Sequence, residues 1–80
     1  MARLRLFGPA RDAAGTSDVL VHGNDVAAIV ARARERFGEP FSTVLDGSRL
    51  WVNGEEANPD TPVGDEDEVA VIPPVSGGCT

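Results

Sequence analysis

The stretch with the clearest capacity for chemistry is PPVSGGCT, residues 73–80, which comes after an apolar, strand-like run. Gly77 and Gly78 have no side chain, so this part of the chain fits a channel too narrow for any Cβ atom. The two prolines before it hold the backbone extended, because proline fixes its own φ and disfavours helix in the preceding residue. The segment is therefore built to present one reactive group, the carboxyl of Gly78.

A free Gly78 carboxylate would be a poor acyl electrophile, but adenylation would give it a good leaving group. Sulfide transfer would then yield a thiocarboxylate, a soft nucleophile on a thin arm. In the printed chain this carboxyl is instead part of the amide to Cys79. We therefore predict a precursor that is cleaved between Gly78 and Cys79.

Two other interpretations of the tail remain open. A diglycine near a chain end is often plain disorder, which would leave an interaction module with an inert tail. Alternatively, the Cys79 thiol could attack the Gly78 carbonyl in an N-to-S acyl shift. That shift is uphill without a strained site, and a flexible tail does not supply one.

Composition excludes several classes of function. The 80 residues carry a net charge of −6, so phosphate backbones and anionic lipid should repel the chain and a protein with a basic surface should attract it. The single cysteine forms no internal disulfide, and His22 has no evident fellow ligands, so we expect no metal and no bound cofactor. Neither a signal peptide nor a spanning segment is apparent, which predicts a cytoplasmic protein.

The elements that position the tail begin with an alternating strand in which Leu4 and Leu6 share one face and Phe7 lies on the other. An amphipathic helix comes later, with Asn24 as the expected N-cap, Gly38 after its last residue and Pro40 preventing continuation. The predicted elements of this half are a strand over residues 2–7, a turn or helical turn over 11–15, a strand over 19–22 and the helix over 26–37.

The second half begins with a short helical turn that should place Phe41 and Leu45 in the core. Asn53-Gly54 is a strong signal for a type I′ hairpin. The last strand is continuously apolar, which predicts burial on both faces and a central position in the sheet. The predicted strands of this half cover residues 50–53, 55–57 and 68–72.

One helix can cover only one face of a sheet, so the order of elements predicts a mixed sheet packed on a single main helix. A right-handed crossover through that helix would make the first and last strands parallel. This is an α+β fold of the β-grasp, ubiquitin-like type, with a mixed sheet of four or five strands. We assign residues 1–75 to the domain and residues 76–80 to a flexible tail.

Three blocks of sequence resemble the small subunit of molybdopterin synthase, one of the ubiquitin-like sulfur carriers of the ThiS and MoaD kind. They are LFGPARDAAGT at residues 6–16, WVNGEEA at 51–57 and GDEDEVAVIPPVSGG at 64–78. The resemblance covers Leu4 to Gly78, and the last block is its most specific part. The chain departs from the family pattern at Cys79-Thr80, because family members usually end at the second glycine.

The resemblance implies a set of partners. An adenylating enzyme of the ubiquitin-activating type would use ATP on Gly78, and a sulfurtransferase would supply sulfur. The large subunit of molybdopterin synthase would then use the thiocarboxylate to build the dithiolene of molybdopterin. Some related carriers, which serve cysteine or other sulfur routes, have extra residues that a zinc-dependent protease removes. The Cys79-Thr80 extension keeps that second pathway open.

The candidate partner-binding residues form two groups. Phe7, Ile72, Pro74 and Val75 are expected to make an apolar patch at the root of the tail, unless the loop over residues 8–15 caps Phe7. Arg11 matches an arginine of the family's first block and would pair with a partner carboxylate, or else with Asp12 or the acidic loop. That loop, residues 65–68, would be solvated or would face a basic rim on the activating enzyme. Trp51 is expected in the core or half-buried in a strand.

Overall fold

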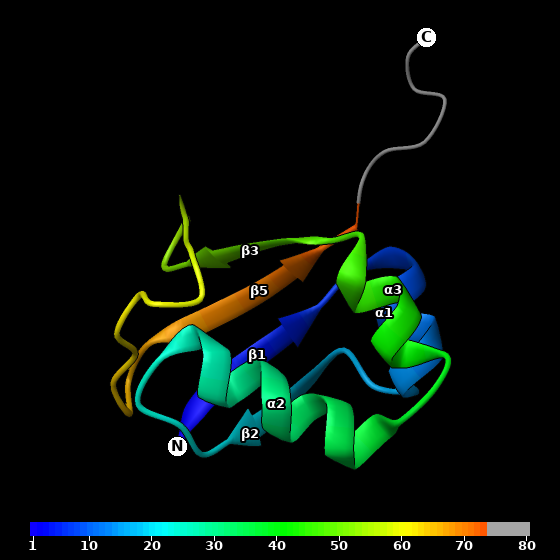
Figure 1. Cartoon of the computed structure of the whole chain (residues 1–80), viewed down its shortest axis with the longest axis horizontal. Coiled ribbons are helices and arrows are strands. Elements are labelled where there is room, and N and C mark those ends of the chain that lie inside the picture. Colours follow the sequence, from blue (N-terminus) through cyan, green and yellow to red (C-terminus); the bar gives the residue numbers. More distant parts are fainter. Residues whose placement is uncertain (74–80) are drawn as a thin grey trace, which may run out of the picture.

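A five-stranded mixed sheet organises the chain in the computed structural model, which describes residues 1–73 (Figure 1). The strands lie in the order β2-β1-β5-β3-β4. Their bounds are β1 Ala2–Leu6, β2 Asp18–Val21, β3 Arg49–Val52, β4 Glu55–Glu56 and β5 Glu68–Ile72. The helices are α1 Gly8–Ala14, α2 Val26–Phe37 and α3 Phe41–Asp46.

The first and last strands form the centre of the sheet, as the sequence predicts. β1 and β5 are parallel, with Leu4 opposite Val69 and Leu6 opposite Val71. All four of these side chains are buried against the helices. The predicted burial of β5 on both faces is wrong, because Ala70 is only partly buried and the helices cover one side of the sheet alone.

The helix α2 has the predicted bounds, but its N-cap is one residue later than expected. The Asp25 carboxylate accepts a hydrogen bond of 2.8 Å from the Ala28 amide. Asn24 is not the cap, because its backbone oxygen accepts a bond of 2.9 Å from the Val63 amide and holds it to the neighbouring loop. A carboxylate at this position also interacts favourably with the positive end of the helix dipole.

The segment after β1 is more ordered than the sequence suggests. Residues 8–14 form the full helix α1, with a proline in its first turn, where the missing amide donor costs no helical bond. The helix ends at Gly15, whose φ of 79° lies in the left-handed region that favours glycine. The prediction for α3 is confirmed, since Phe41 and Leu45 are both buried.

The β3–β4 hairpin turns through Asn53 and Gly54, whose φ values of 52° and 88° fit the predicted type I′ turn. Asn53 also ties the hairpin to the loop before β5. Its amide nitrogen donates to Asp67 Oδ1 at 3.0 Å, and its amide oxygen accepts from the Glu68 amide at 3.0 Å. The backbone amide of Gly64 donates to Asp67 Oδ2 at 2.8 Å, so both carboxylate oxygens of Asp67 are hydrogen-bonded.

The core lies between the sheet and the three helices. Its members are apolar residues from every layer: Ala2, Leu4, Leu6, Ala10, Val21, Val26, Ile29, Ala33, Phe41, Leu45, Val63, Val69 and Val71. Val63 is a loop residue that the sequence pattern does not mark as core. No helix within residues 1–73 is long and apolar enough to cross a membrane.

We expect the ionisation of Asp67 to make the free energy of unfolding depend on pH in the acid range. Hydrogen bonds from the Gly64 amide and then from Asn53 lower the pKa of Asp67 below its ordinary value of 3.8. Because the folded-state pKa is depressed, the stabilisation is present above pH 3.8 and is lost as the pH falls through the lowered value. Asp67→Asn should therefore unfold more readily than the wild type at neutral pH, with the difference shrinking in acid.

Urea denaturation at a series of pH values measures this difference. Glu66→Gln is the matched control, since it removes one negative charge from the same loop without touching the Asn53 network. A gap between Asp67→Asn and wild type that stays constant into the acid range would contradict the assignment.

Candidate functional site

The chain leaves the domain from the middle of the sheet. β5 pairs with β1 on one side and with β3 on the other, and it ends at Ile72. Pro73 is the last described residue, and Figure 1 shows the chain leaving the fold at this end of the sheet. The predicted site residues Pro74, Val75, Gly77, Gly78 and Cys79 lie outside the described residues.

The structure brings Phe7 and Ile72 together at this end. Phe7 comes after β1 with extended backbone, φ −127° and ψ 151°, so its side chain continues the outward alternation of the strand. The register that pairs Leu6 with Val71 puts Phe7 beside Ile72 on the outer face. Phe7 is 41% exposed and Ile72 39% exposed, so the segment over residues 8–15 does not cap Phe7.

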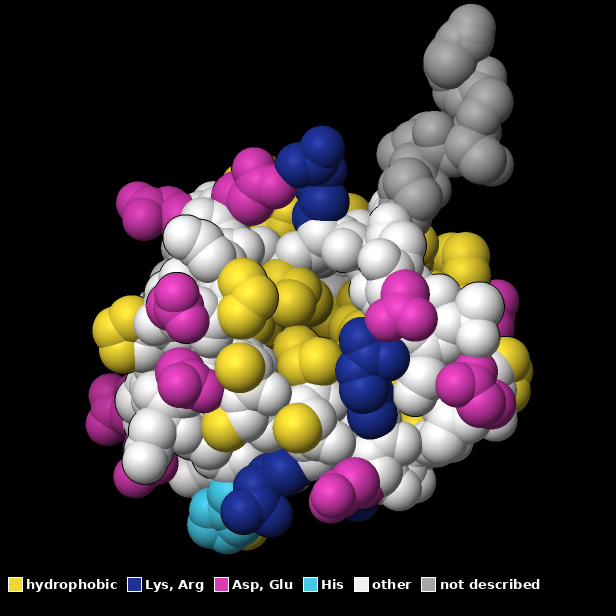
Figure 2. Space-filling model, in the orientation of Figure 1, with side chains coloured by type: hydrophobic (Ala, Val, Ile, Leu, Met, Phe, Trp, Pro, Cys, Tyr) yellow, Lys and Arg dark blue, Asp and Glu magenta, His cyan; other side chains and the backbone are white. Residues whose placement is uncertain are grey.

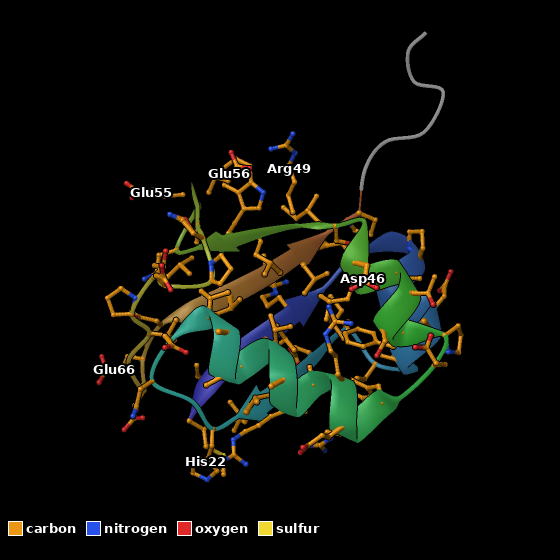
Figure 3. The ribbon with its side chains drawn as sticks, in the orientation of Figure 1. His22, Asp46, Arg49, Glu55, Glu56 and Glu66 are labelled. Atoms are coloured by element: carbon orange, nitrogen blue, oxygen red, sulfur yellow. The ribbon has the colours of Figure 1, made fainter. Side chains whose placement is uncertain are left out.

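Two arginines frame this apolar pair, and sequence reasoning did not include them in the site. The guanidinium of Arg5 lies 5.7 Å from the centre of the Phe7 ring, a cation–π distance, and donates to Glu68 at 3.0 Å. Arg49 is in register with Ile72 and forms an ion pair with Glu56, as Figure 3 shows. Because side chains alternate between the two faces of a strand, the sequence alone places Arg5 on the same face as Phe7. Arg49 could be found only from the pairing of β3 with β5.

Arg11 projects from α1, the helix that comes after Phe7. Its side chain is exposed, and it makes no ion pair or side-chain hydrogen bond with any of residues 1–73. The alternative of an internal bond to Asp12 or to the acidic loop is therefore not found in this part of the chain. Arg11 lines a shallow polar hollow with Asp12, Gly15, Thr16 and Ser17. Its contact with a partner stays a prediction.

The acidic run lies at the other end of the sheet from the tail. Glu68 is in register with Arg3 near the start of β1, and Asp65 contacts the Met1 amino group at 3.1 Å. The run therefore lies away from the root of the tail, except that the Glu68 side chain reaches Arg5 beside the apolar pair. Trp51 is half-buried in β3, opposite Ala70 on the outer face, which confirms the expected half-buried strand position.

The site supplies a binding surface rather than a catalytic centre. Its described members are an apolar pair and two arginines, each already paired with a glutamate, and none is a nucleophile or a general base. Residues 1–73 contain no cluster of His, Cys, Asp or Glu that could hold a metal ion.

A mixed sheet with one long helix across it, and a chain that leaves from the central strand, defines a ubiquitin-like β-grasp protein. The model of the ThiS family matches residues 4–78, almost the whole sequence. The chain belongs to this family, whose members are ubiquitin-like sulfur carriers.

Solved structures agree with this fold. Small archaeal modifier protein 1 from Haloferax volcanii is 28% identical, with a TM-score of 0.80 over 96% of this chain and 98% of that one. Subunit 1 or 2 in the molybdopterin-converting factor complex from Helicobacter pylori 26695 matches at 27% identity and a TM-score of 0.74, over 96% and 97% of the chains. A chain of the BexX/CysO complex from Amycolatopsis orientalis matches at 19% identity and a TM-score of 0.82, over 98% and 100%.

We expect Ile72→Asp to abolish binding to the adenylating enzyme that the sequence predicts as a partner, while the isolated domain stays folded. The position is exposed at the end of β5, so a charge there disrupts an apolar interface but does not enter the core. The cost in unfolding free energy should stay within about 1 kcal/mol, the span of strand propensities. Calorimetric titration and circular dichroism measure the two effects.

Leu20→Asp is the control, because it adds the same charge on the same sheet face from the edge strand β2. It should leave this binding intact. Unfolding of the domain by Ile72→Asp, or equal loss of binding in Leu20→Asp, would show that the surface at the root of the tail is assigned wrongly.

Proposed function

We propose that this chain is a sulfur carrier for the synthesis of molybdopterin, with Gly78 as the residue that is charged. The observation that carries the proposal is the extent of the family match, which runs from residue 4 through the diglycine to residue 78. The similarity is therefore one of the domain and the tail together. A β-grasp module with an inert tail would need to resemble the family only in the domain.

The proposed reaction sequence uses the free carboxylate of Gly78. One carboxylate oxygen attacks the α-phosphorus of ATP in the active site of the adenylating enzyme, and pyrophosphate leaves. Sulfide delivered by a sulfurtransferase then attacks the acyl carbon, and AMP leaves with the bonding electron pair. The product is a thiocarboxylate at Gly78, formed without any change in the oxidation state of carbon.

The domain serves this chemistry by holding and presenting the tail. The exit from the central strand fixes the root of the tail in the part of the sheet that is paired on both sides. Phe7 and Ile72 offer an apolar contact at this root, and Arg5 and Arg49 surround it with charges balanced by glutamates. A partner that docks there would receive the tail in one direction.

The molybdopterin route is favoured by the three sequence blocks and by the match to the Helicobacter pylori complex of subunits 1 and 2. In that route the large subunit of molybdopterin synthase is the final partner, and it consumes the thiocarboxylate. ATP belongs to the activating enzyme, and this chain binds no cofactor of its own.

A second candidate is a carrier for cysteine or another sulfur-containing metabolite. The observation that favours it is the Cys79-Thr80 extension, since the Gly78 carboxyl is an amide to Cys79 in this sequence and a protease would have to free it before it could be charged. A zinc-dependent protease of the deubiquitinase type would perform this step. The fold is shared with the CysO-containing complex and does not separate the two candidates.

We expect the 80-residue chain to resist charging and a chain that ends at Gly78 to accept sulfur. The reason is that an amide carbonyl offers no carboxylate oxygen to attack ATP. Both forms would be incubated with ATP, the adenylating enzyme and a sulfur donor, and intact mass spectrometry would detect the replacement of one oxygen by sulfur. Equal conversion of untrimmed full-length protein would exclude the precursor role.

The same experiment separates the two routes when the charged carrier is then given either the large molybdopterin synthase subunit with its pterin substrate, or a cysteine-synthase-type acceptor. Formation of a dithiolene with the first acceptor supports the molybdopterin route. Transfer only to the second acceptor would replace it with the cysteine route.

Gly77→Val, in the chain that ends at Gly78, should lower kcat/KM for adenylation by about a hundredfold, the loss typical of a small misplacement of a reacting group. A branched side chain blocks a narrow channel and restricts φ. Ser76→Val is the control, since it places the same side chain just before the diglycine. Normal charging of Gly77→Val would remove the argument for a narrow channel.

A further inference from the structure

The strand β2 has a free edge. Within residues 1–73 it is the outermost strand on its side of the sheet and pairs only with β1. The Leu6 amide donates to the Ser17 oxygen at 2.8 Å, and in antiparallel pairs the bonded positions alternate. Val19 and Val21 therefore direct their backbone groups to β1, and Leu20 directs its amide and carbonyl outward. The described residues provide no hydrogen bond to either group of Leu20.

A groove runs beside this edge, between β2 and the second half of α2. It has a volume of about 310 Å³ and is lined by Met1, Leu20, Val21, His22, Arg32, Glu35 and Arg36. Leu20 is 53% exposed and borders the groove. The groove therefore combines an open strand edge with an apolar contact.

The walls of the groove are basic although the chain as a whole is acidic. Arg32 and Arg36 lie one turn apart on the same side of α2, and both are exposed. Neither belongs to an ion pair within residues 1–73. The Arg36 guanidinium lies 5.9 Å from the centre of the Phe37 ring, which leaves its donors free. Glu35 is the single acidic residue of the lining.

Figure 2 shows the histidine next to basic side chains at one margin of the molecule, and Figure 3 labels it as His22. Arg5, Arg34 and Arg49 each pair with a carboxylate of this chain. Arg3, Arg11, Arg32 and Arg36 form no ion pair within residues 1–73, and of these four Arg32 and Arg36 line the groove.

We propose that this edge and groove bind an extended acidic segment of a partner protein, which adds a strand to β2. The outward backbone groups of Leu20 would hydrogen-bond to the added strand, as in other cases of strand addition. Carboxylates of the segment would pair with Arg32 and Arg36. The apolar side chains that alternate with them would contact Leu20.

The charge distribution argues against a second copy of this chain as the occupant. A symmetric pairing of two β2 edges would bring the arginines of both copies to the same side, with like charges opposed. The copies also carry a net charge of −6 each, which opposes their association.

The groove lies away from the root of the tail. β2 runs antiparallel to β1, so its last residue pairs with Ala2, whereas the tail leaves from the end where β1 finishes. Figure 3 places His22 and the start of the tail at opposite margins. A partner held at β2 would leave Gly78 free to enter another active site, so the inference goes beyond the proposed sulfur transfer and does not depend on it.

The test uses the full chain and a synthetic peptide of alternating valine and glutamate residues, with binding monitored by amide chemical shifts in NMR spectra. We expect saturable shifts at Leu20, Val21, His22, Arg32 and Arg36. Leu20→Pro should abolish them, because it removes an outward donor at an edge position where proline is tolerated and β1 loses no bond. The same peptide with lysine in place of glutamate should not bind.

Arg32→Glu combined with Arg36→Glu should weaken the binding of the peptide by about tenfold. The matched control is Arg11→Glu combined with Arg49→Glu, which changes the net charge equally but elsewhere, and it should retain the affinity. Absence of shifts, equal binding of the lysine peptide, or shifts centred on Phe7 and Ile72 would overturn the proposal. If a single-stranded RNA oligonucleotide occupied the groove equally well, the groove would be a phosphate-binding site, and the proposal would be overturned as well.

Discussion

The central position of β5 is the constraint on which the rest of the structure depends. β5 pairs in parallel with β1 up to Val71 and antiparallel with β3 up to Ile72, so its backbone is held on both sides almost to its last residue. The parallel pairing requires a crossover, and α2 is the element that makes it. This arrangement determines where the chain leaves the sheet, which face of the sheet the helices cover and which strands lie at its edges.

The helices lie on one side of the sheet, so its two faces have different roles. Val69 and Val71 point into the core, and Ala70 and Ile72 point to the open side. The same alternation in β1 buries Leu4 and Leu6 and leaves Arg5 and Phe7 outside. A docking surface at the root of the tail therefore requires no special loop, since it consists of the outward residues at the ends of two central strands.

Charge is distributed unevenly over this acidic chain. Arg5 and Arg49 near the tail are paired with glutamates, so the apolar contact there is framed by neutralised charges. At the far margin Arg32 and Arg36 have no such partner in the described residues. The molecule therefore has a local basic groove although its net charge is −6. The net charge describes only how the molecule attracts or repels charged partners at long range.

Local signals in the sequence determined most of the elements and led to the chemistry proposed for the tail. The spacing of Val26, Ile29 and Ala33 defines α2, and Asn53-Gly54 defines the hairpin, because each depends on residues a few positions apart. The role proposed for Gly77 and Gly78 depends on backbone freedom and a carboxyl group, which require no knowledge of the fold. The tertiary structure decided which distant residues meet. Asp25 rather than Asn24 caps α2 because a loop distant in the sequence bonds to Asn24, by way of Val63. Arg49 joins the surface of Phe7 and Ile72 only through the register of β3 with β5, and the basic groove exists only because β2 packs beside α2. Such contacts depend on strand register and packing, and a one-residue shift in register would turn every side chain of the strand to the other face without changing the sequence.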